Sequence, residues 1–410
     1  MRSRILTGTA FIAASCLAVA GCGSKGEQTS SGSASSGTLA IGASVSLTGT
    51  LAREGQLTKE GYQLCQTKVN AQGGVDIGGT KTKLDIQYQD DTSKPDVAAQ
   101  LVDQFNDKGV KLILSSYGSA NTEAQAAVIE RNGQVMADSA GADDKIFQKG
   151  YQRTFAVLSP ATQYAASMVS AISQLASPKP KTVVFLSADD GFSKTVTDGG
   201  MKAAKAAGFT VLPPQYFPNG TSDVSSALTK VKGEHPDVII GSVHLVEGVA
   251  IVKQAQELGV TPLAFAETVA PPTPDFTKTL GAQAEDVLGS SQWTTATVGQ
   301  DSYFGDAKQY AADIQSTYGH VADYHNAEAS AACLALVLAA QKAGSTQPDA
   351  VRDALAALDT MSFFGRIKFN SVGQNVYKPM SVIQIQKGKA MTVWPKDAAQ
   401  AQMIWPATTQ

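Results

Sequence analysis

Apolar runs typical of strands alternate with amphipathic helical patterns along most of this chain. A strand is expected at 39–45 and a helix at 57–74, and a strand at 83–89 precedes a helix that begins near Pro95. A strand, a helix and a further strand in succession favour two parallel strands with the helix packed on their sheet. The pattern continues through expected strands at 110–114, 135–137, 182–186, 211–212, 237–240 and 263–265, and expected helices at 122–132, 164–175, 194–208, 222–232 and 246–259. The sequence therefore predicts an α/β protein with parallel sheets covered on both faces.

The first 37 residues differ from the rest in composition. Basic residues at 1–4 precede a small, apolar stretch at 5–20, which indicates a signal sequence rather than a spanning helix. The sequence Val19-Ala20-Gly21-Cys22 is typical of a bacterial lipobox, in which cleavage precedes Cys22 and the cysteine is lipidated. The alternative is a chance cysteine behind an ordinary signal peptide. We expect 1–22 to be a lipoprotein signal peptide and lipobox, and the Ser/Gly-rich 23–37 to be a flexible tether.

Charge and cysteine content restrict the partners of the folded part. The net charge is only −3, which gives no indication of a nucleic-acid partner. Cys16 leaves with the signal sequence, whereas Cys65 and Cys333 lie among apolar residues in helical patterns. Free buried thiols are the favoured interpretation, and a Cys65–Cys333 disulfide stays open as the alternative. The sequence contains no metal-ligand spacing and no cofactor motif, so no metal and no cofactor are expected.

The segment 110–122, VKLILSSYGSANT, is the first candidate for binding. A buried strand passes through a hydroxyl- and glycine-rich turn into a helix. The first N–H groups of a helix have no intrahelical acceptor and carry the positive end of its dipole. Gly118 and Ser119 would let a small anion such as a carboxylate reach them. An ordinary Ser/Asn/Thr helix cap is the alternative.

Catalytic motifs are missing from the sequence. There is no GxSxG, CxxC or HExxH pattern, and the segment 73–82 fits a turn between a helix and a strand better than a phosphate loop. His244 with Glu247 is at most half of a metal site. Ligands of parallel sheets bind at the carboxyl ends of the strands. The residues expected there are Ser119, Ala140, Gly141, Ala142, His244 and Glu267.

The order of motifs resembles one family along the whole body of the chain, roughly 38–406. These motifs are SLTGTLAREGQLTKEGYQL, VNAQGGVDIGGTKTKLDIQYQDDTSKP, LSSYGSANTEA, VKGEHPDVIIGSVH, IVKQAQELGV and FFGRIKFNSVGQN. Together they resemble the solute-binding proteins of branched-chain amino acid ABC transporters, the leucine/isoleucine/valine-binding family of type I periplasmic binding proteins. The resemblance implies two Rossmann-like lobes joined by three hinge crossovers. We expect 38–157 plus 293–365 to form the N-terminal lobe and 158–292 plus 366–405 the C-terminal lobe.

The resemblance also implies roles for individual residues. Gly118, Ser119 and the segment Ala140-Gly141-Ala142 would hold the carboxylate of an amino acid, and Glu267 from the other lobe would receive its ammonium group. His244 and Phe192 match aromatic positions that line the cleft, and Glu54 stands where relatives often carry tyrosine. The alternative for His244, Phe192 and Glu54 is a place in the core, and the alternative for Glu267 is an acid in a solvated loop. Asp90 and Asp91 are expected to cap a loop, and Trp293 and Tyr324 to pack or to form the hinge, with lining of the cleft as the alternative for these two.

Three departures bear on the ligand. Ala142 replaces a threonine, His244 replaces a tyrosine, and Glu54 adds a charge. These departures point to a ligand other than leucine or valine, such as a polar or basic amino acid or an amide. The implied function is an extracytoplasmic, lipid-anchored solute-binding protein. It would bind an amino acid or related small molecule and deliver it to the subunits of an ABC permease. A sensor that uses the same cleft and an extracytoplasmic hydrolase are the alternatives. The absence of a nucleophile–base motif argues against an enzyme.

Overall fold

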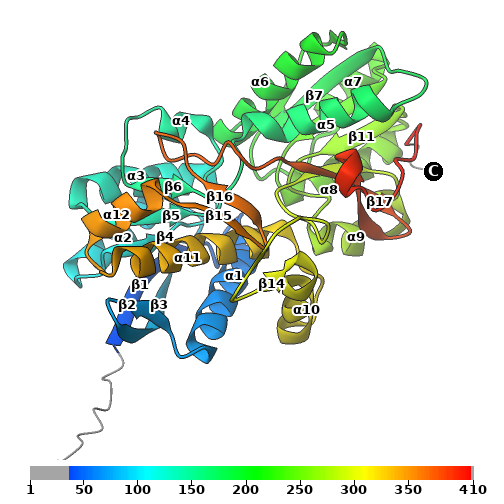
Figure 1. The fold of residues 1–410 in the computed structure, drawn as a ribbon. Coiled ribbons are helices and arrows are strands. Elements are labelled where there is room, and N and C mark those ends of the chain that lie inside the picture. The colour runs from blue at the N-terminus through cyan, green and yellow to red at the C-terminus, as the bar shows by residue number, and fades with distance from the viewer. Residues whose placement is uncertain (1–36, 408–410) are drawn as a thin grey trace, which may run out of the picture. The chain divides into compact units, whose positions relative to one another are not determined.

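The computed structural model of this protein describes residues 37–407. The predicted signal peptide and lipobox at 1–22, with Cys22, lie outside the described residues, as does nearly all of the predicted tether. Among residues 37–407, no helix is both long and apolar enough to cross a membrane. The described chain contains two large sheets and the helices that cover them (Figure 1).

The first sheet has six strands in the order β2-β3-β1-β4-β5-β6. All neighbouring strands are parallel except β2 and β3, which form a hairpin through the turn at Gly78 and Gly79. The segment 73–82 is therefore part of a hairpin and not a direct turn from helix to strand. A strand of three residues such as β2 is too short to show a recognisable pattern in the sequence. The strands are β1 (Gly37–Val45), β2 (Val75–Ile77), β3 (Thr80–Asp90), β4 (Leu112–Leu114), β5 (Val135–Asp138) and β6 (Thr154–Ala156).

The second sheet has eight strands in the order β18-β17-β12-β11-β10-β7-β8, with β9 also paired to β7. Strands β12, β11, β10, β7, β8 and β9 are all parallel to the strands they pair with among themselves. Strand β17 is antiparallel to β12, and β18 is antiparallel to β17. Its strands are β7 (Thr182–Ala188), β8 (Thr210–Val211), β9 (Gln215–Phe217), β10 (Val238–Ser242), β11 (Ala264–Glu267), β12 (Leu288–Ser291), β17 (Ser381–Gln386) and β18 (Lys389–Trp394). Two small hairpins complete the strands: β13 (Gln300–Asp301) with β14 (Gly305–Asp306), and β15 (Asp359–Ser362) with β16 (Gly365–Lys368).

Helices cover both faces of each sheet, as the alternation of strand and helix patterns predicts. Along β4, Leu112 and Leu114 pack with α1 and α11, whereas Ile113 packs with α2 and α3, because successive side chains of a strand point to opposite faces. In the second sheet, α5 and α6 cover one face, and α7 and α8 the other. The helices are α1 (Ala52–Ala71), α2 (Pro95–Asp107), α3 (Ser119–Asn132), α4 (Asp144–Phe147), α5 (Thr162–Leu175), α6 (Gly191–Ala206), α7 (Ser225–Glu234), α8 (Leu245–Leu258), α9 (Pro274–Leu280), α10 (Ala307–Tyr318), α11 (Tyr324–Ala343) and α12 (Pro348–Ala356), with short 3₁₀ turns η1 (Gly281–Ala284) and η2 (Lys396–Ala398).

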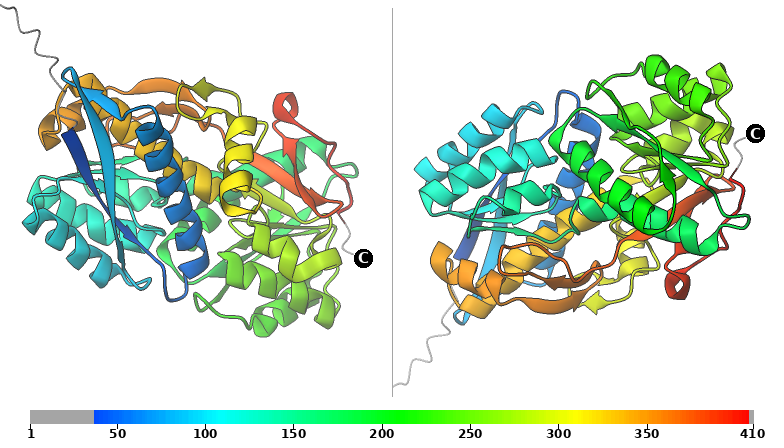
Figure 2. Two further views of the ribbon diagram at one scale, coloured as in Figure 1. Left: turned by 90° about the horizontal axis from the view of Figure 1, so that it is seen from below. Right: turned by 90° about the horizontal axis from the view of Figure 1, so that it is seen from above.

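The chain crosses between the two sheets three times. It leaves the first sheet after β6, and after β12 it returns to the first lobe, where α10, α11, α12 and the hairpin β15–β16 pack against the first sheet. It leaves this lobe again after β16 to enter β17 (Figure 2). One residue from each crossing meets the other two. Gln292 accepts a hydrogen bond from the Ser159 backbone N–H at 2.9 Å and donates one to its carbonyl at 3.0 Å. The Lys378 carbonyl accepts a hydrogen bond from the Ser159 hydroxyl at 2.9 Å. The side-chain ammonium group of Lys378 donates a hydrogen bond to the Gln292 carbonyl. These contacts hold the three crossovers together.

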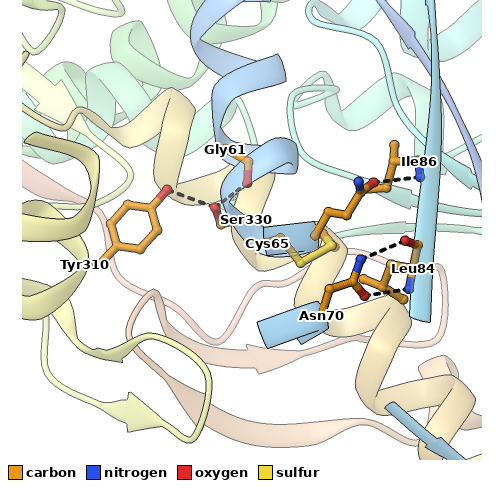
Figure 3. Close-up of a disulfide and its surroundings, with 9 residues drawn as sticks. Gly61, Cys65, Asn70, Leu84, Ile86, Tyr310 and Ser330 are labelled. Atoms are coloured by element: carbon orange, nitrogen blue, oxygen red, sulfur yellow. Dashed lines mark hydrogen bonds between the residues drawn. A yellow bond between two sulfur atoms is a disulfide. The ribbon is translucent and has the colours of Figure 1, made fainter. Parts of the chain in front are cut away.

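A disulfide joins α1 to α11 beneath the first sheet (Figure 3). Cys65 and Cys333 have Cα atoms 6.3 Å apart, and both side chains are fully buried. The favoured interpretation of free thiols is therefore wrong, and the alternative holds. Sequence could not decide this, because 268 positions separate the two cysteines and only the packing of α1 on α11 brings them together. Beside the disulfide, the amide of Asn70 pairs with both backbone groups of Leu84 and so completes the edge of β3 (Figure 3).

Candidate functional site

A cavity lies where the carboxyl ends of strands from both sheets meet. Its volume is only about 10 Å³, roughly the space of one water molecule, so the two lobes are closed upon it. The lining residues come from both sides: Tyr117, Gly118, Ser119, Ala140, Tyr324 and Glu328 from the first sheet and its helices, and Tyr164, Phe192, His244 and Val269 from the second. Entry of any solute larger than water therefore requires the lobes to separate.

The N-terminus of α3 forms one wall of the cavity. Sequence placed the helix after a turn at 115–122, but α3 begins earlier, at Ser119. Gly118 precedes it with φ of 91°, a backbone conformation that favours glycine. The Ser119 hydroxyl accepts a hydrogen bond from the Asp143 backbone N–H at 3.1 Å, which leaves its own proton free to donate. The N–H groups of Ser119 and Ala120 have no acceptor within the helix. This wall thus offers hydrogen-bond donors and a positive dipole end.

The turn after β5 offers fewer donors than expected. The backbone N–H groups of Ala140 and Gly141 donate to the Asp138 carboxylate at 2.9 and 2.8 Å. Burial raises the pKa of Asp138 to about 6, although these bonds and one from Ser115 oppose that shift. Of the segment expected to hold a carboxylate, only Ala140 lines the cavity, and Ala142 is buried behind it.

His244 lies on the opposite wall and forms a charged pair. Its Nε2 is 3.7 Å from an oxygen of Asp190, and its Nδ1 is 3.3 Å from the Tyr117 hydroxyl. Burial lowers the pKa of His244, but the contact with Asp190 outweighs it and raises that pKa to about 9. The imidazole is therefore charged at neutral pH. Phe192 packs on it with ring centroids 5.3 Å apart.

Glu267 does not line the cavity. It is the last residue of β11 and shares a face with Phe265, so its side chain points toward α8. A side chain at Gly248 would meet its carboxylate, since a Cβ there lies 2.7 Å from Oε2. Neither carboxylate oxygen has a hydrogen-bond partner among the described residues. Burial and then the nearby charge of Glu247 raise the pKa of Glu267 well above its usual value.

Contacts between the lobes surround the cavity. Glu54 is buried on α1 and accepts a hydrogen bond from the Leu245 backbone N–H at 3.4 Å, so it touches the start of α8 without lining the cavity. Arg53 beside it pairs with Asp275, and Asp143 accepts a hydrogen bond from the Thr195 hydroxyl at 2.8 Å. These contacts form only when the lobes are closed.

Two structural expectations hold. Asp90 accepts hydrogen bonds from the Leu47 and Thr92 backbone N–H groups, at 2.9 and 2.8 Å, and so caps a loop. Trp293 is buried and donates to the Phe363 carbonyl at 3.0 Å, as a packing residue does. Among residues 37–407, no three histidine, cysteine or acidic side chains gather in a way that could hold a metal ion.

Sequence reasoning missed four of the lining residues and gave a fifth, Tyr324, only as an alternative. Tyr117 stands directly before Gly118 in the loop that was singled out, so the signal was present. Tyr324 lines the cavity, so the alternative to a packing or hinge role holds for this residue. Glu328 is the single acid in the small and apolar run of α11, a signal that could have been noticed. Tyr164 and Val269 lie in segments with no distinctive pattern.

Comparison with known proteins fits this geometry. A family model described as "Periplasmic binding protein" matches residues 38–390. The "Leu/Ile/Val-binding protein homolog 8" of Brucella abortus is 27% identical over 373 residues, which covers 84% of this chain and 87% of that protein. The homolog 7 of the same organism is 24% identical over 365 residues, with 84% and 88% covered.

Solved structures share the fold. The branched-chain amino acid transporter substrate-binding protein LivJ of Streptococcus pneumoniae, in complex with isoleucine, has a TM-score of 0.76 at 22% identity, with 90% of this chain and 100% of that chain covered. A solute-binding protein of R. palustris in complex with benzoate has a TM-score of 0.73 at 16% identity, with 87% and 96% covered. This is the type I periplasmic binding protein fold that the sequence predicted. The chain belongs to the periplasmic binding protein family, whose members bind solutes and are not enzymes.

Proposed function

We propose that this protein is the extracytoplasmic solute-binding component of an ABC importer for an amino acid or a related small amide or organic acid. The observation that carries the proposal is the closed cavity between two lobes joined by three crossovers, with the N-terminus of α3 on one wall. The printed names of the relatives, which are Leu/Ile/Val-binding protein homologues, support the same class of ligand. Release of the ligand to permease subunits follows from opening of the cleft.

Charge on the two walls supports a ligand with a carboxylate. The free N–H groups and hydroxyl at Ser119 and the charged imidazole of His244 both favour an anion. A solute held by both walls stabilises the closed form over the open one. We therefore place the carboxylate end at Gly118 and Ser119, with His244 and Phe192 closing over it. The resemblance implies that Glu267 receives the ammonium group and that Glu54 lies in the cleft. Neither side chain lines the cavity, so we do not carry these two assignments into the proposal.

A thermal-shift screen tests the proposed ligand class. The purified protein is heated with each free amino acid, small amides and small organic acids, and with sugars as the control set. A ligand at a hundred times its dissociation constant adds about 2.7 kcal/mol to the free energy of unfolding, which raises the melting temperature by several degrees. If only sugars raise it, or if no compound does, the proposed function is wrong.

We also propose that the protein is anchored to the outer face of the membrane through a lipid on Cys22. The support is the basic start, the apolar stretch and the lipobox-like end of the first 22 residues. We expect Cys22→Ser to release the exported protein from the membrane fraction, and its continued sedimentation with membranes would refute the anchor. The lobe boundaries, 38–157 plus 293–365 and 158–292 plus 366–405, belong to the proposed two-lobed binding protein and stay predictions.

A further inference from the structure

Glu328 is a buried acid that faces the cavity without a protein partner. It lies on α11, lines the cavity, and is only 1% exposed. Its Oε2 is fully buried and has no hydrogen-bond partner among the described residues. A buried carboxylate oxygen in this position is costly unless a donor reaches it. The side chain therefore lacks a hydrogen-bond donor, and a ligand in the cavity is the group that can supply an N–H or O–H to it.

No basic side chain among residues 37–407 forms an ion pair with Glu328. Lys378 is the basic residue whose charge acts on Glu328, but its ammonium donates to the carbonyl and side-chain oxygens of Gln292. No ion pair within 4.0 Å joins Glu328 to any basic residue of 37–407. Burial raises the pKa of Glu328 well above its usual value, and the charges of Asp323 and Asp138 raise it further against the opposing effect of Lys378. An arriving cation would reverse this shift.

Aromatic rings form the rest of the cavity wall around this carboxyl group. Tyr164 meets Phe192 edge to face with ring centroids 5.3 Å apart, and Tyr117 and Tyr324 complete the lining on the side of α11. Aromatic faces attract a cation, and the attraction grows when water is excluded. The rings alone would suit a quaternary ammonium group. A quaternary group has no N–H, however, and would leave the Glu328 oxygen unpaired.

We propose that Glu328, rather than Glu267, receives the cationic end of the ligand, and that this end is a protonated amine that can donate hydrogen bonds. The inference rests on the proposed function, since it assigns the second end of a solute whose carboxylate lies at Ser119. It predicts selection for ammonium-bearing solutes over the same carbon skeletons without nitrogen. Glu267 is the natural comparison, because it is equally buried and its carboxylate oxygens also have no hydrogen-bond partner among the described residues, but it does not line the cavity.

The test uses calorimetric affinities for matched pairs of probes: L-leucine with 4-methylpentanoate, L-phenylalanine with 3-phenylpropanoate, and L-lysine with 6-aminohexanoate and hexanoate. For pairs that bind, we expect the wild type to prefer the α-amine by about 10- to 100-fold, the range of a hydrogen bond to a charged group. Glu328→Gln should abolish that preference while keeping affinity for the deaminated acid. Glu267→Gln, the matched control, should keep the preference. Glu328→Asp, which retains the charge, should keep part of it.

The outcomes separate the two proposals. If probes bind but Glu328→Gln keeps the wild-type preference, or if the preference is lost in Glu267→Gln instead, the role of Glu328 is wrong and the proposed function stands. If deaminated acids bind as tightly as amino acids, the cation is not recognised and the inference also fails. If no probe and no compound of the wider screen binds, the proposed function fails and the inference falls with it. Melting curves without ligand show whether each variant is folded.

Discussion

At the scale of single residues, the pair formed by His244 and Asp190 distinguishes this cavity. His244 stands where the resemblance implies a tyrosine, so a neutral ring is replaced by one that can carry charge. Asp190 has two functions there: it caps α6 by accepting from the Ser193 backbone N–H at 2.9 Å, and it faces the imidazole. Although burial opposes it, the contact with His244 holds the pKa of Asp190 below its usual value. Asp190 thus makes the largest contribution to the charge of His244, and the charges of Glu247 and Glu54 add to it.

This pair predicts a pH dependence of stability. The pKa of His244 is about 9 in the folded protein, above the value of about 6.5 for an unfolded chain. Its stabilisation is therefore fully present below pH of about 6.5 and is lost as the pH rises through about 9. Asp190→Asn keeps a good helix cap but removes the charge. We therefore expect it to destabilise the protein most between about pH 4 and 6.5, where Asp190 is ionised and His244 is charged, and least above pH of about 9. Urea denaturation at several pH values measures this effect.

A cap variant provides the control for the pH experiment. Ser193→Ala removes a hydroxyl bonded to Asp190 and leaves the carboxylate charge in place. Its effect on the free energy of unfolding should be nearly constant across the same pH range. An NMR titration reads the imidazole directly: a wild-type His244 pKa below 7 would contradict the assigned pair.

At the scale of elements, the register of parallel strands decides which residues meet. Leu114 of β4 pairs with Ala137 of β5, so the two strands end together and the following loops bring Ser119 and Ala140 to one cavity. In β11, the place where the strand ends does not favour the expectation that Glu267 faces the cleft. The strand extends through that residue, which keeps its side chain on the face toward α8, and Val269 just beyond the strand reaches the cavity instead. An error of two residues in the expected end of this strand is enough to exchange Glu267 and Val269 at the cavity.

At the scale of the whole molecule, the disulfide encloses most of the chain in one covalent loop. The chain between Cys65 and Cys333, which are 268 positions apart, includes five of the six strands of the first sheet and six of the eight strands of the second. In the chain-entropy account, such a link stabilises a protein mainly by restricting its unfolded state, and more strongly for longer loops. The lobes share this constraint although the bond lies within only one of them.

Removal of the disulfide should therefore weaken the whole protein. We expect the double variant Cys65→Ala, Cys333→Ala to lower the free energy of unfolding by about 2–5 kcal/mol in urea. The unfolded state without the link is more expanded, so the denaturant slope should also rise. Wild-type protein treated with dithiothreitol is the matched control and should give the same curve as the variant. Coincident curves for oxidised and reduced wild type would contradict this account.

The sequence by itself determined the fold class and the position of the first wall of the site. The alternation of apolar strands and amphipathic helices predicts the covered parallel sheets, and the small residues around Gly118 indicate a helix N-terminus open to a ligand, because both signals are local in the chain. Only the tertiary structure decided the rest. The pairing of Cys65 with Cys333, the direction of Glu267 and the place of Glu328 depend on how α11 and β11 pack against elements distant in sequence. No local pattern records that packing.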